Sequence, residues 1–241
     1  MRTSSIFSLY DSEGNYEVEI FDHPKPATVI VCAHGNGVRR WDGEKFFYAV
    51  AEHFAKSAVL LVDQNQPDGD GVRLSPLPIL VSRVTGLVHE ARQRYPNTPL
   101  VVMGHSMGCG VASLLDTNDI QAMVFVAPAV GKPRQSLVER YGPDIVNGKT
   151  VTTSEGLKKV VTAEYYKSVE DIDWEESYAS LVKRFQTVYV YESGDDEIVG
   201  DGRFRHRAIP FAQYTVIDGA KHNLSGAPLA VLFGLIDGLQ F

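Results

Sequence analysis

The stretch at residues 99–112 constrains the fold of this chain more than any other. An apolar run over residues 100–103 predicts a fully buried strand, and the small residues that follow the motif predict a helix. Between them lies Ser106, with Gly104 two residues before it and Gly108 two residues after it. A sharp corner between strand and helix strains its central residue and needs neighbours without side chains, which glycine provides. The stretch therefore predicts a serine at the tip of such a corner.

The five residues at this corner form the pattern Gly-x-Ser-x-Gly. Occurring alone, this pattern is common by chance, but a buried strand before it and a helix after it are typical of a nucleophile elbow. An elbow lifts the serine hydroxyl clear of the sheet and directs the N–H of the next residue, Met107, toward the reacting oxygen. Ser106 is therefore the candidate nucleophile.

The rest of the chain alternates strand and helix patterns. Apolar runs predict strands at residues 28–33, 58–62, 121–127, 187–191 and 214–217, and amphipathic stretches predict helices near residues 46–54, 80–91 and 177–185. Residues 6–21 alternate as an edge hairpin with its turn at residues 11–15. This order predicts an α/β fold with a mostly parallel central sheet flanked by helices, in a single domain over residues 1–241.

Residues 133–173 add no strand to this predicted sheet. Asn147-Gly148 and the threonine-rich residues 150–153 predict a short hairpin, with its turn at Asn147-Gly148. Such a segment is either a lid over a site or a packed peripheral element, and we favour a short lid insertion. The polar loop at residues 63–78 precedes a helix, and its acidic residues 68–71 lack the terminal glutamate of a calcium loop, so we expect a solvated turn there.

Composition excludes several classes of partner. A formal net charge of −7 argues against nucleic acid and anionic membrane surfaces. No apolar run approaches the roughly 18 residues that a membrane-spanning helix needs, and residues 1–10 do not resemble a signal peptide, so we expect a cytoplasmic protein. Cys32 and Cys109 lie in apolar surroundings and are expected to be buried free thiols.

Two polar loops offer partners for the serine. A serine hydroxyl is a weak nucleophile until a base takes its proton, and that base is usually a histidine held by a carboxylate. Asp195 and Asp196 follow the strand at 187–191, and His222 follows the strand at 214–217. The carboxyl ends of parallel strands share one edge of a sheet, so Ser106, one of the two aspartates and His222 are expected to converge.

These motifs, in this order, resemble serine hydrolases of the α/β-hydrolase superfamily over nearly the whole chain. The matching pieces are the His34-Gly35 loop, the Ser106 elbow, the acid turn at residues 196–199 and the histidine loop at residues 219–222. The resemblance implies Ser106 as nucleophile, His222 as base, Asp196 as acid, and an oxyanion hole from the backbone N–H groups of Asn36 and Met107. Gly200 stands where many relatives carry proline, and Gly194 lies one place closer to Asp196 than usual, which leaves Asp195 a possible rival.

The resemblance implies a carboxylesterase-like hydrolase that cleaves a small-molecule acyl ester through an acyl-enzyme on Ser106, without cofactor or metal. A thioesterase, an amidase or peptidase, or an acyltransferase would use the same groups, and a non-catalytic scaffold is a further alternative. The segment at 133–173 resembles the small lids of some carboxylesterases. The pattern assigns neither substrate-binding residues nor an oligomeric state.

The remaining histidines and aromatic residues have simpler expected roles. His34 and His105 lack the carboxylate pairing of a metal site, and we expect His105 to make polar contacts within the elbow. The histidines expected on the surface are His23, His53, His89 and His206. The aromatic residues expected in the core, with an acyl pocket as the alternative, are Trp41, Phe46 and Tyr48.

Overall fold

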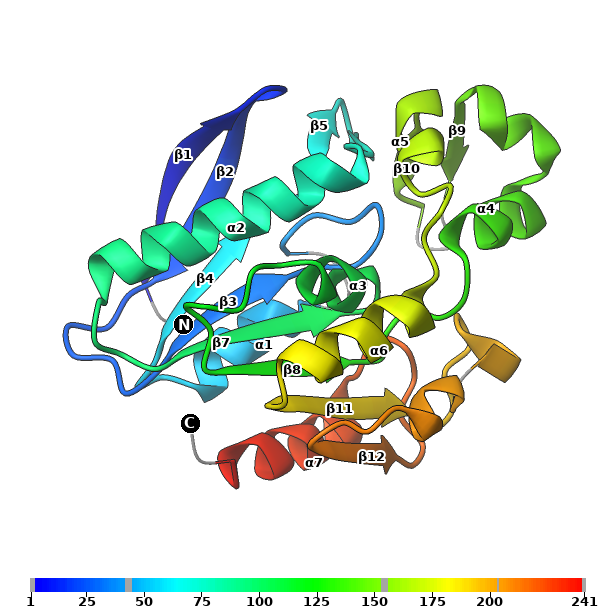
Figure 1. Ribbon diagram of the computed structural model, residues 1–241. Helices are drawn as coiled ribbons and strands as arrows, with labels where there is room; N and C mark the ends of the chain where they lie inside the picture. The colour runs from blue at the N-terminus through cyan, green and yellow to red at the C-terminus, as the bar shows by residue number, and fades with distance from the viewer. Residues whose placement is uncertain (1–2, 42–44, 153–155, 203, 240–241) are drawn as a thin grey trace.

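The central feature of the molecule is a twisted eight-stranded sheet (Figure 1). The structure is a computed structural model that describes residues 3–41, 45–152, 156–202 and 204–239. The strands, in their order across the sheet, are β1 (Ser5–Asp11), β2 (Gly14–Phe21), β4 (Ala58–Val62), β3 (Val29–Ala33), β7 (Leu100–His105), β8 (Ala122–Val126), β11 (Val188–Ser193) and β12 (Gln213–Ile217). The pairs β1–β2 and β2–β4 are antiparallel and the others are parallel. The predicted mostly parallel sheet and its edge hairpin are confirmed.

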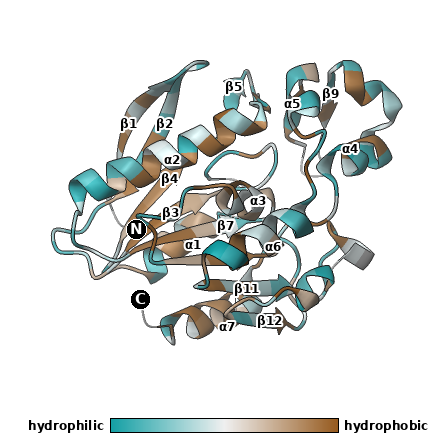
Figure 2. Ribbon diagram, viewed as in Figure 1, coloured by the Kyte–Doolittle hydropathy of each residue, from teal (hydrophilic) through white to brown (hydrophobic). Residues whose placement is uncertain are grey.

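Helices cover both faces of this sheet, as the alternation predicted (Figures 1 and 2). One face packs against α2 (Leu77–Arg94), α3 (Met107–Ser113) and α6 (Trp174–Arg184), and the other against α1 (Phe46–His53) and α7 (Gly226–Asp237). Successive side chains of a strand point to opposite faces, so Val102 of β7 belongs to the first core and Val101 to the second. Apolar residues therefore run almost without interruption along the central strands.

A second, smaller sheet was not predicted. It contains β5 (Gln66–Asp68), β6 (Gly71–Arg73), β10 (Lys158–Val161) and β9 (Lys149–Thr152), in that order. The loop at residues 63–78 therefore holds a hairpin, and its strand β6 pairs in parallel with β10 from the segment at 133–173. The acidic turn lies at the tip of that hairpin, where Asp70 forms an ion pair with Lys158.

The segment at 133–173 has more structure than a simple hairpin. It holds α4 (Pro133–Tyr141), a 3-10 helix η1 (Pro143–Asn147), β9, β10 and α5 (Ala163–Ser168). The predicted turn at Asn147-Gly148 is wrong, because these residues end η1 and lead into β9, and the connection from β9 to β10 comes later. Part of that connection, including Thr153 of the threonine-rich stretch, lies outside the described residues. Tyr165 of α5 is fully buried and belongs to the first core.

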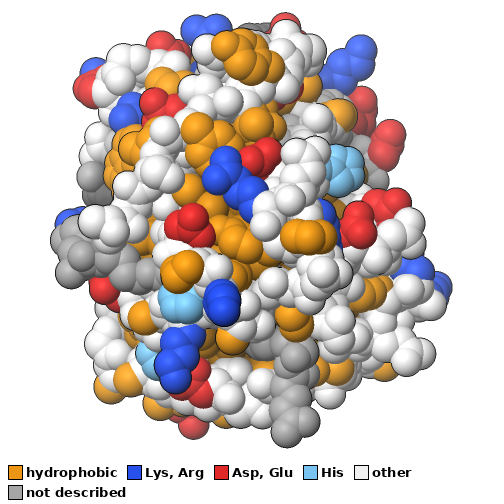
Figure 3. All heavy atoms as spheres, turned by 90° about the vertical axis from the view of Figure 1, so that its left-hand side faces the viewer, with side chains coloured by type: hydrophobic (Ala, Val, Ile, Leu, Met, Phe, Trp, Pro, Cys, Tyr) orange, Lys and Arg blue, Asp and Glu red, His pale blue; other side chains and the backbone are white. Residues whose placement is uncertain are grey.

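The surface mixes charges of both signs with apolar side chains on the face shown in Figure 3. Among the described residues, no helix is long and apolar enough to cross a membrane. Cys32 and Cys109 are buried and unpaired, as predicted. The surface prediction is wrong for His206, which is fully buried in the short helix η3 (Arg205–Ala208) beside Glu192 and Tyr178.

Candidate active site

Ser106 stands at the corner between β7 and α3 with a strained backbone. Its φ of 55° and ψ of −125° lie in a region that residues with side chains rarely adopt. The flanking glycines make the corner possible: a Cβ on Gly108 would lie 1.9 Å from the carbonyl oxygen of Ala33, and one on Gly104 would lie 2.7 Å from the backbone of Cys109. The predicted elbow is therefore present.

The loops after β11 and β12 bring an aspartate and a histidine to the serine. His222 Nε2 lies 2.9 Å from Ser106 Oγ, and His222 Nδ1 lies 2.7 Å from Asp196 Oδ2. Both side chains are buried, His222 being 6% and Asp196 2% exposed. The structure thus brings together the three side chains that the sequence pointed to, in one hydrogen-bonded chain.

The two adjacent aspartates have opposite surroundings. Asp195 is exposed, whereas Asp196 turns inward and its Oδ1 accepts hydrogen bonds from the N–H groups of Ile198 and Val199 at 2.9 and 2.8 Å. Burial alone would raise the pKa of Asp196, but the hydrogen bond and charge of His222 and the two N–H groups outweigh it, and the pKa lies below its usual value. Ile198, two residues later, is 41% exposed and lines both cavities at Ser106.

The ionised carboxylate determines how His222 is protonated. An acceptor at Nδ1 requires the ring to carry its proton there, which leaves Nε2 free to accept the hydroxyl proton of Ser106. The backbone of His222 is held as well, because its carbonyl accepts from His105 Nε2 at 2.9 Å and its N–H donates to Glu197 at 3.2 Å. His105 therefore makes the polar contact expected of it.

The loop after β3 passes close to the serine hydroxyl. A Cβ on Gly35 would lie 3.2 Å from Ser106 Cβ, so this backbone runs directly beside the nucleophile. Asn36 follows and lines the space in front of Ser106, and its side-chain oxygen is buried with no hydrogen-bond partner among the described residues. On the other side, the sulfur of Met107 accepts from the hydroxyl of Tyr165 at 3.1 Å. Asn36 and Met107 thus both line the space in front of the hydroxyl.

Two cavities meet at Ser106. They share six lining residues, namely Asn36, Ser106, Arg140, Tyr141, Ile198 and His222. The first, of about 420 Å³, is called here the Trp174 cavity; its further lining includes Met107, Val130, Ser136, Leu137, Glu139 and Trp174. The second, of about 450 Å³, is called the Lys159 cavity; its further lining includes His34, Val38, Phe46, Phe47, Thr152, Lys159 and Glu197. Both volumes fall in the range of small-molecule sites.

Sequence reasoning missed the residues that α4 and β10 contribute to these walls. Arg140 and Tyr141 end α4, and Lys159 is a buried residue of β10. The only signal was the position of the whole segment at 133–173, because its short elements have no strong periodicity. Of the three aromatic residues considered for a pocket, only Phe46 lines a cavity, while Tyr48 bonds to Glu19 and Trp41 lies beneath Arg40.

A metal centre is not indicated by the side chains. Within residues 3–41, 45–152, 156–202 and 204–239, no group of three or more His, Cys, Asp or Glu residues is arranged to hold an ion. His34, in the loop that carries Asn36, instead bonds to the carbonyl of Gly35 at 3.0 Å and accepts from the N–H of Gln64 at 2.9 Å.

Known structures share this architecture. The chain is similar to Est1E from Butyrivibrio proteoclasticus, at 16% identity and a TM-score of 0.73 over 96% of this chain and 95% of that one, and Est1E is also solved with ferulic acid bound. It is similar to the α/β hydrolase GrgF from Penicillium sp. sh18, at 12% identity and a TM-score of 0.66 over 98% and 97% of the two chains. Carboxyl esterase 2 from Tuber melanosporum matches at 15% identity and a TM-score of 0.60 over 97% and 83%.

Sequence comparison identifies the family. Comparison with the curated proteins gives no significant match. Residues 24–194, well over half of the chain, match the model of the family described as serine aminopeptidase, S33. With the α/β-hydrolase fold of the central sheet and the elbow at Ser106, this match shows that the chain is a hydrolase of the serine aminopeptidase S33 family, within the α/β-hydrolase superfamily.

Proposed function

We propose that the protein is a serine carboxylesterase that forms an acyl-enzyme on Ser106. The observation that carries this proposal is the hydrogen-bonded chain from Ser106 through His222 to Asp196, at 2.9 and 2.7 Å, in front of two cavities. This arrangement fits a nucleophile, a general base and an orienting carboxylate.

In the proposed first step, Ser106 Oγ attacks the ester carbonyl carbon while its proton passes to His222 Nε2. Asp196 holds the proton on Nδ1 and stabilises the imidazolium that forms. The backbone N–H groups of Asn36 and Met107 donate to the negative oxygen of the tetrahedral intermediate. When the intermediate collapses, the bond to the alcohol oxygen breaks and His222 returns the proton to that oxygen.

The second step repeats the sequence with water. Water gives a proton to His222 Nε2 and its oxygen attacks the acyl carbon. The bond to Ser106 Oγ then breaks, and His222 returns the proton to the serine. No external cofactor enters either step.

We assign the Trp174 cavity to the acyl group and the Lys159 cavity to the alcohol. Trp174 and Leu137 provide an apolar wall for an acyl chain or ring, and the two cavities meet where the carbonyl carbon must lie. Residues 133–173 supply wall residues to both cavities, which supports their role as a lid insertion in the single domain. The substrate expected from two cavities of this size is a small ester.

The family description makes a peptidase the second candidate. An aminopeptidase must hold the free ammonium group of its substrate, usually with a carboxylate. Among the described residues, the only carboxylate that lines the Trp174 cavity is Glu139, which is exposed on α4, and Glu197, which lines the Lys159 cavity, already accepts from the N–H of His222. This lining favours an ester over a peptide with a free amino terminus. Thioester cleavage, acyl transfer and a non-catalytic scaffold role are the remaining alternatives.

A labelling experiment tests the proposal. A fluorophosphonate should modify Ser106, as mapped by mass spectrometry, and Ser106→Ala should abolish both labelling and ester hydrolysis while the protein stays folded. Wild-type activity is then compared on p-nitrophenyl esters of increasing acyl length, methyl ferulate, acyl thioesters and aminoacyl p-nitroanilides. Labelling of another serine, or full hydrolysis by Ser106→Ala, would contradict the assignment, and a preference for the anilides would favour the peptidase.

A further inference from the structure

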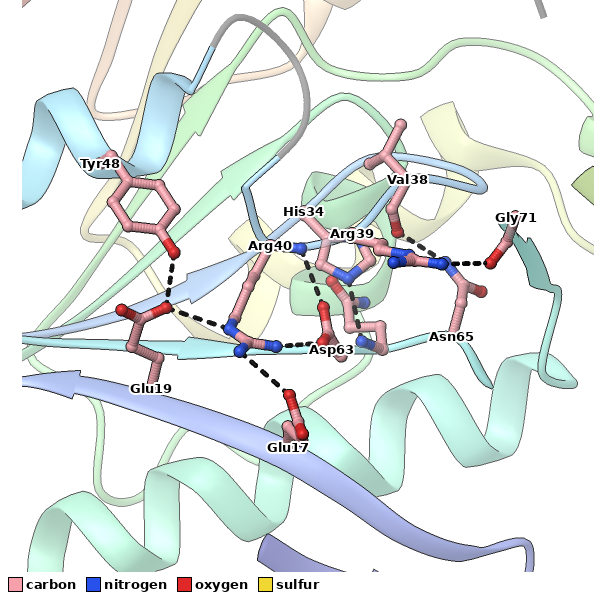
Figure 4. Close-up of polar contacts among 11 residues, drawn as sticks. Glu17, Glu19, His34, Val38, Arg39, Arg40, Tyr48, Asp63, Asn65 and Gly71 are labelled. Atoms are coloured by element: carbon pink, nitrogen blue, oxygen red, sulfur yellow. Dashed lines mark hydrogen bonds and ion pairs between the residues drawn. The ribbon is translucent and has the colours of Figure 1, made fainter. Parts of the chain in front are cut away.

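The loop that carries Asn36 ends in a buried arginine surrounded by carboxylates (Figure 4). Arg40 is 3% exposed, and its guanidinium donates to Glu19 at 3.1 Å, to Glu17 at 3.0 Å and to Asp63. Its backbone N–H also donates to Asp63 at 2.9 Å. The side chain of Arg40 is thus bonded to β2 and to the residue that follows β4, and its backbone is bonded to that same residue.

The carboxylates have further donors that hold them in place. Glu19 accepts from the hydroxyls of Tyr48 and Ser4, each at 2.6 Å, in addition to Arg40. Burial would raise the pKa of Glu19, but these hydrogen bonds outweigh it and the pKa lies below its usual value. In Glu19 the guanidinium therefore bonds to a carboxylate that stays ionised at neutral pH, which gives a strong charge-assisted hydrogen bond in a buried setting.

The same loop is anchored at its other end. His34 accepts from the N–H of Gln64, and Asn65 donates to the carbonyl of Val38 at 3.3 Å. Residues 34–40 contain no helix or strand, so these side-chain bonds and the Arg40 cluster hold the backbone between its two ends. Asn36 lies in the middle of this span, four residues before Arg40.

We propose that Arg40 is a positioning residue for the oxyanion hole: held by Glu19 and Asp63, it fixes the loop at residues 34–40 so that the backbone N–H of Asn36 points at the substrate oxygen. This inference rests on the proposed function of Ser106. Arg40 itself does not line either cavity and does not touch the substrate. Its loss should therefore affect the transition state, where the oxygen carries its charge, more than substrate binding.

The test compares Arg40→Lys with the wild type and with Arg92→Met. Lysine keeps the charge but cannot donate to three carboxylates with fixed geometry. Arg92 is the matched control: it donates to the carbonyls of Thr98 and Asp119 at the amino ends of β7 and β8, at the opposite edge of the sheet from Ser106. For each protein, circular dichroism and the melting temperature report folding. Activated-ester kinetics give kcat and KM, and a trifluoromethyl ketone measures affinity for the tetrahedral intermediate.

Folded Arg40→Lys should lose about 10- to 100-fold in kcat, with KM within about threefold, since removing one oxyanion donor outright costs about 10²- to 10³-fold. The affinity of Arg40→Lys for the trifluoromethyl ketone should fall by a similar factor, and Arg92→Met should keep the wild-type kcat. A folded Arg40→Lys with kcat within threefold of the wild type, or with kcat and KM changed as in Arg92→Met, overturns the inference.

If Arg40→Lys does not fold, Tyr48→Phe carries the test, because it removes one donor to Glu19 and leaves the ion pairs in place. It should lower kcat by a few fold at unchanged KM, and an unchanged kcat overturns the inference. The proposed function fails separately: a wild-type protein that takes no phosphonate on Ser106 rejects both, whereas a labelled wild type with an unaffected Arg40→Lys rejects only the role of Arg40.

Discussion

Backbone strain at Ser106 is tied to the position of its hydroxyl. The residue is held at a positive φ because β7 and α3 meet at an angle that only close contact of Gly104 and Gly108 with their neighbours allows. The same corner points Oγ toward His222. A side chain at either glycine would separate these groups, so the chemistry of the serine depends on residues that never touch a substrate.

Exchange of each aspartate for asparagine should separate the roles of the adjacent pair. Asp196→Asn removes the charge that holds the proton on His222 Nδ1, so kcat should fall by about 10²- to 10⁴-fold while KM changes little. Asp195→Asn is the matched control, and because its side chain is exposed it should keep kcat within about threefold. Steady-state kinetics on one activated ester measure both. A severe loss in Asp195→Asn alone would move the role to that residue.

At the scale of elements, the small second sheet joins the segment at 133–173 to the main fold. Strand β10 pairs in parallel with β6, and α5 packs Tyr165 against Met107 behind the elbow. The segment therefore contacts the main fold at points far apart in sequence. Two of its exposed residues line different cavities: Ser136 lines the Trp174 cavity and Thr152 the Lys159 cavity.

Those two positions allow a paired test of the cavity assignment. Ser136→Phe should narrow the Trp174 cavity and lower kcat/KM for long acyl esters by about tenfold relative to acetyl esters. Thr152→Phe should instead lower kcat/KM for bulky alcohols at a constant acyl group. Both residues are exposed, so the melting temperature should change little. Measurement of both substrate series with both variants checks the assignment. If Ser136→Phe affected the alcohol series and Thr152→Phe the acyl series, the assignment would be reversed. If both variants affected both series equally, it would be rejected.

The main sheet and the meeting of Ser106, His222 and an aspartate at its edge were predictable because their sequence signals are local. Buried parallel strands appear as continuous apolar runs, and the elbow needs glycines at fixed positions. The acid-turn pattern favoured Asp196 but left Asp195 a rival, since the choice depends on which aspartate receives the N–H groups of Ile198 and Val199. That information appears only once the loop has folded.

The rest depends on contacts between distant residues. The strands β5 and β6 have three residues each, too few to show a period; they pair with each other, and β6 also pairs with the distant β10. Glu19 alternates with apolar neighbours as a solvent-facing residue would, yet it is buried because Arg40 returns from a later loop to neutralise it. His206 is likewise buried by contacts with residues distant in sequence, Glu192 and Tyr178.

Over the whole molecule, the site lies at the carboxyl edge of the sheet, where loops from β3, β7, β11 and β12 meet between the two cores. This placement buries ionisable groups that the unfolded chain exposes. His105 is an example: it lies between Phe46 and His222, and burial, with the nearby charge of His222, lowers its pKa to about 3. Its neutral ring donates to the carbonyl of His222 and so helps to hold the backbone of His222 in place.

A buried neutral histidine makes stability depend on pH in a definite direction. Between about pH 6.5, where histidine titrates in an unfolded chain, and pH 3, the unfolded state binds a proton at this position and the folded state does not. Protons therefore favour unfolding. The contribution of His105 to the free energy of unfolding is fully present above about pH 6.5, and it declines by about 1.4 kcal/mol for each pH unit below that. Urea unfolding at pH 7, 6, 5 and 4.5 measures the slope before most carboxylates titrate.

His105→Gln isolates this contribution, because an amide can still donate to the carbonyl of His222 but does not titrate. Its free energy of unfolding should be lower than that of the wild type at pH 7, and the difference should shrink as the pH falls to 4.5. His89→Gln, on the exposed face of α2, is the matched control and should follow the wild-type slope. If His105→Gln kept the full wild-type slope between pH 6 and 4.5, the acid sensitivity would have to come from other buried groups at this edge of the sheet.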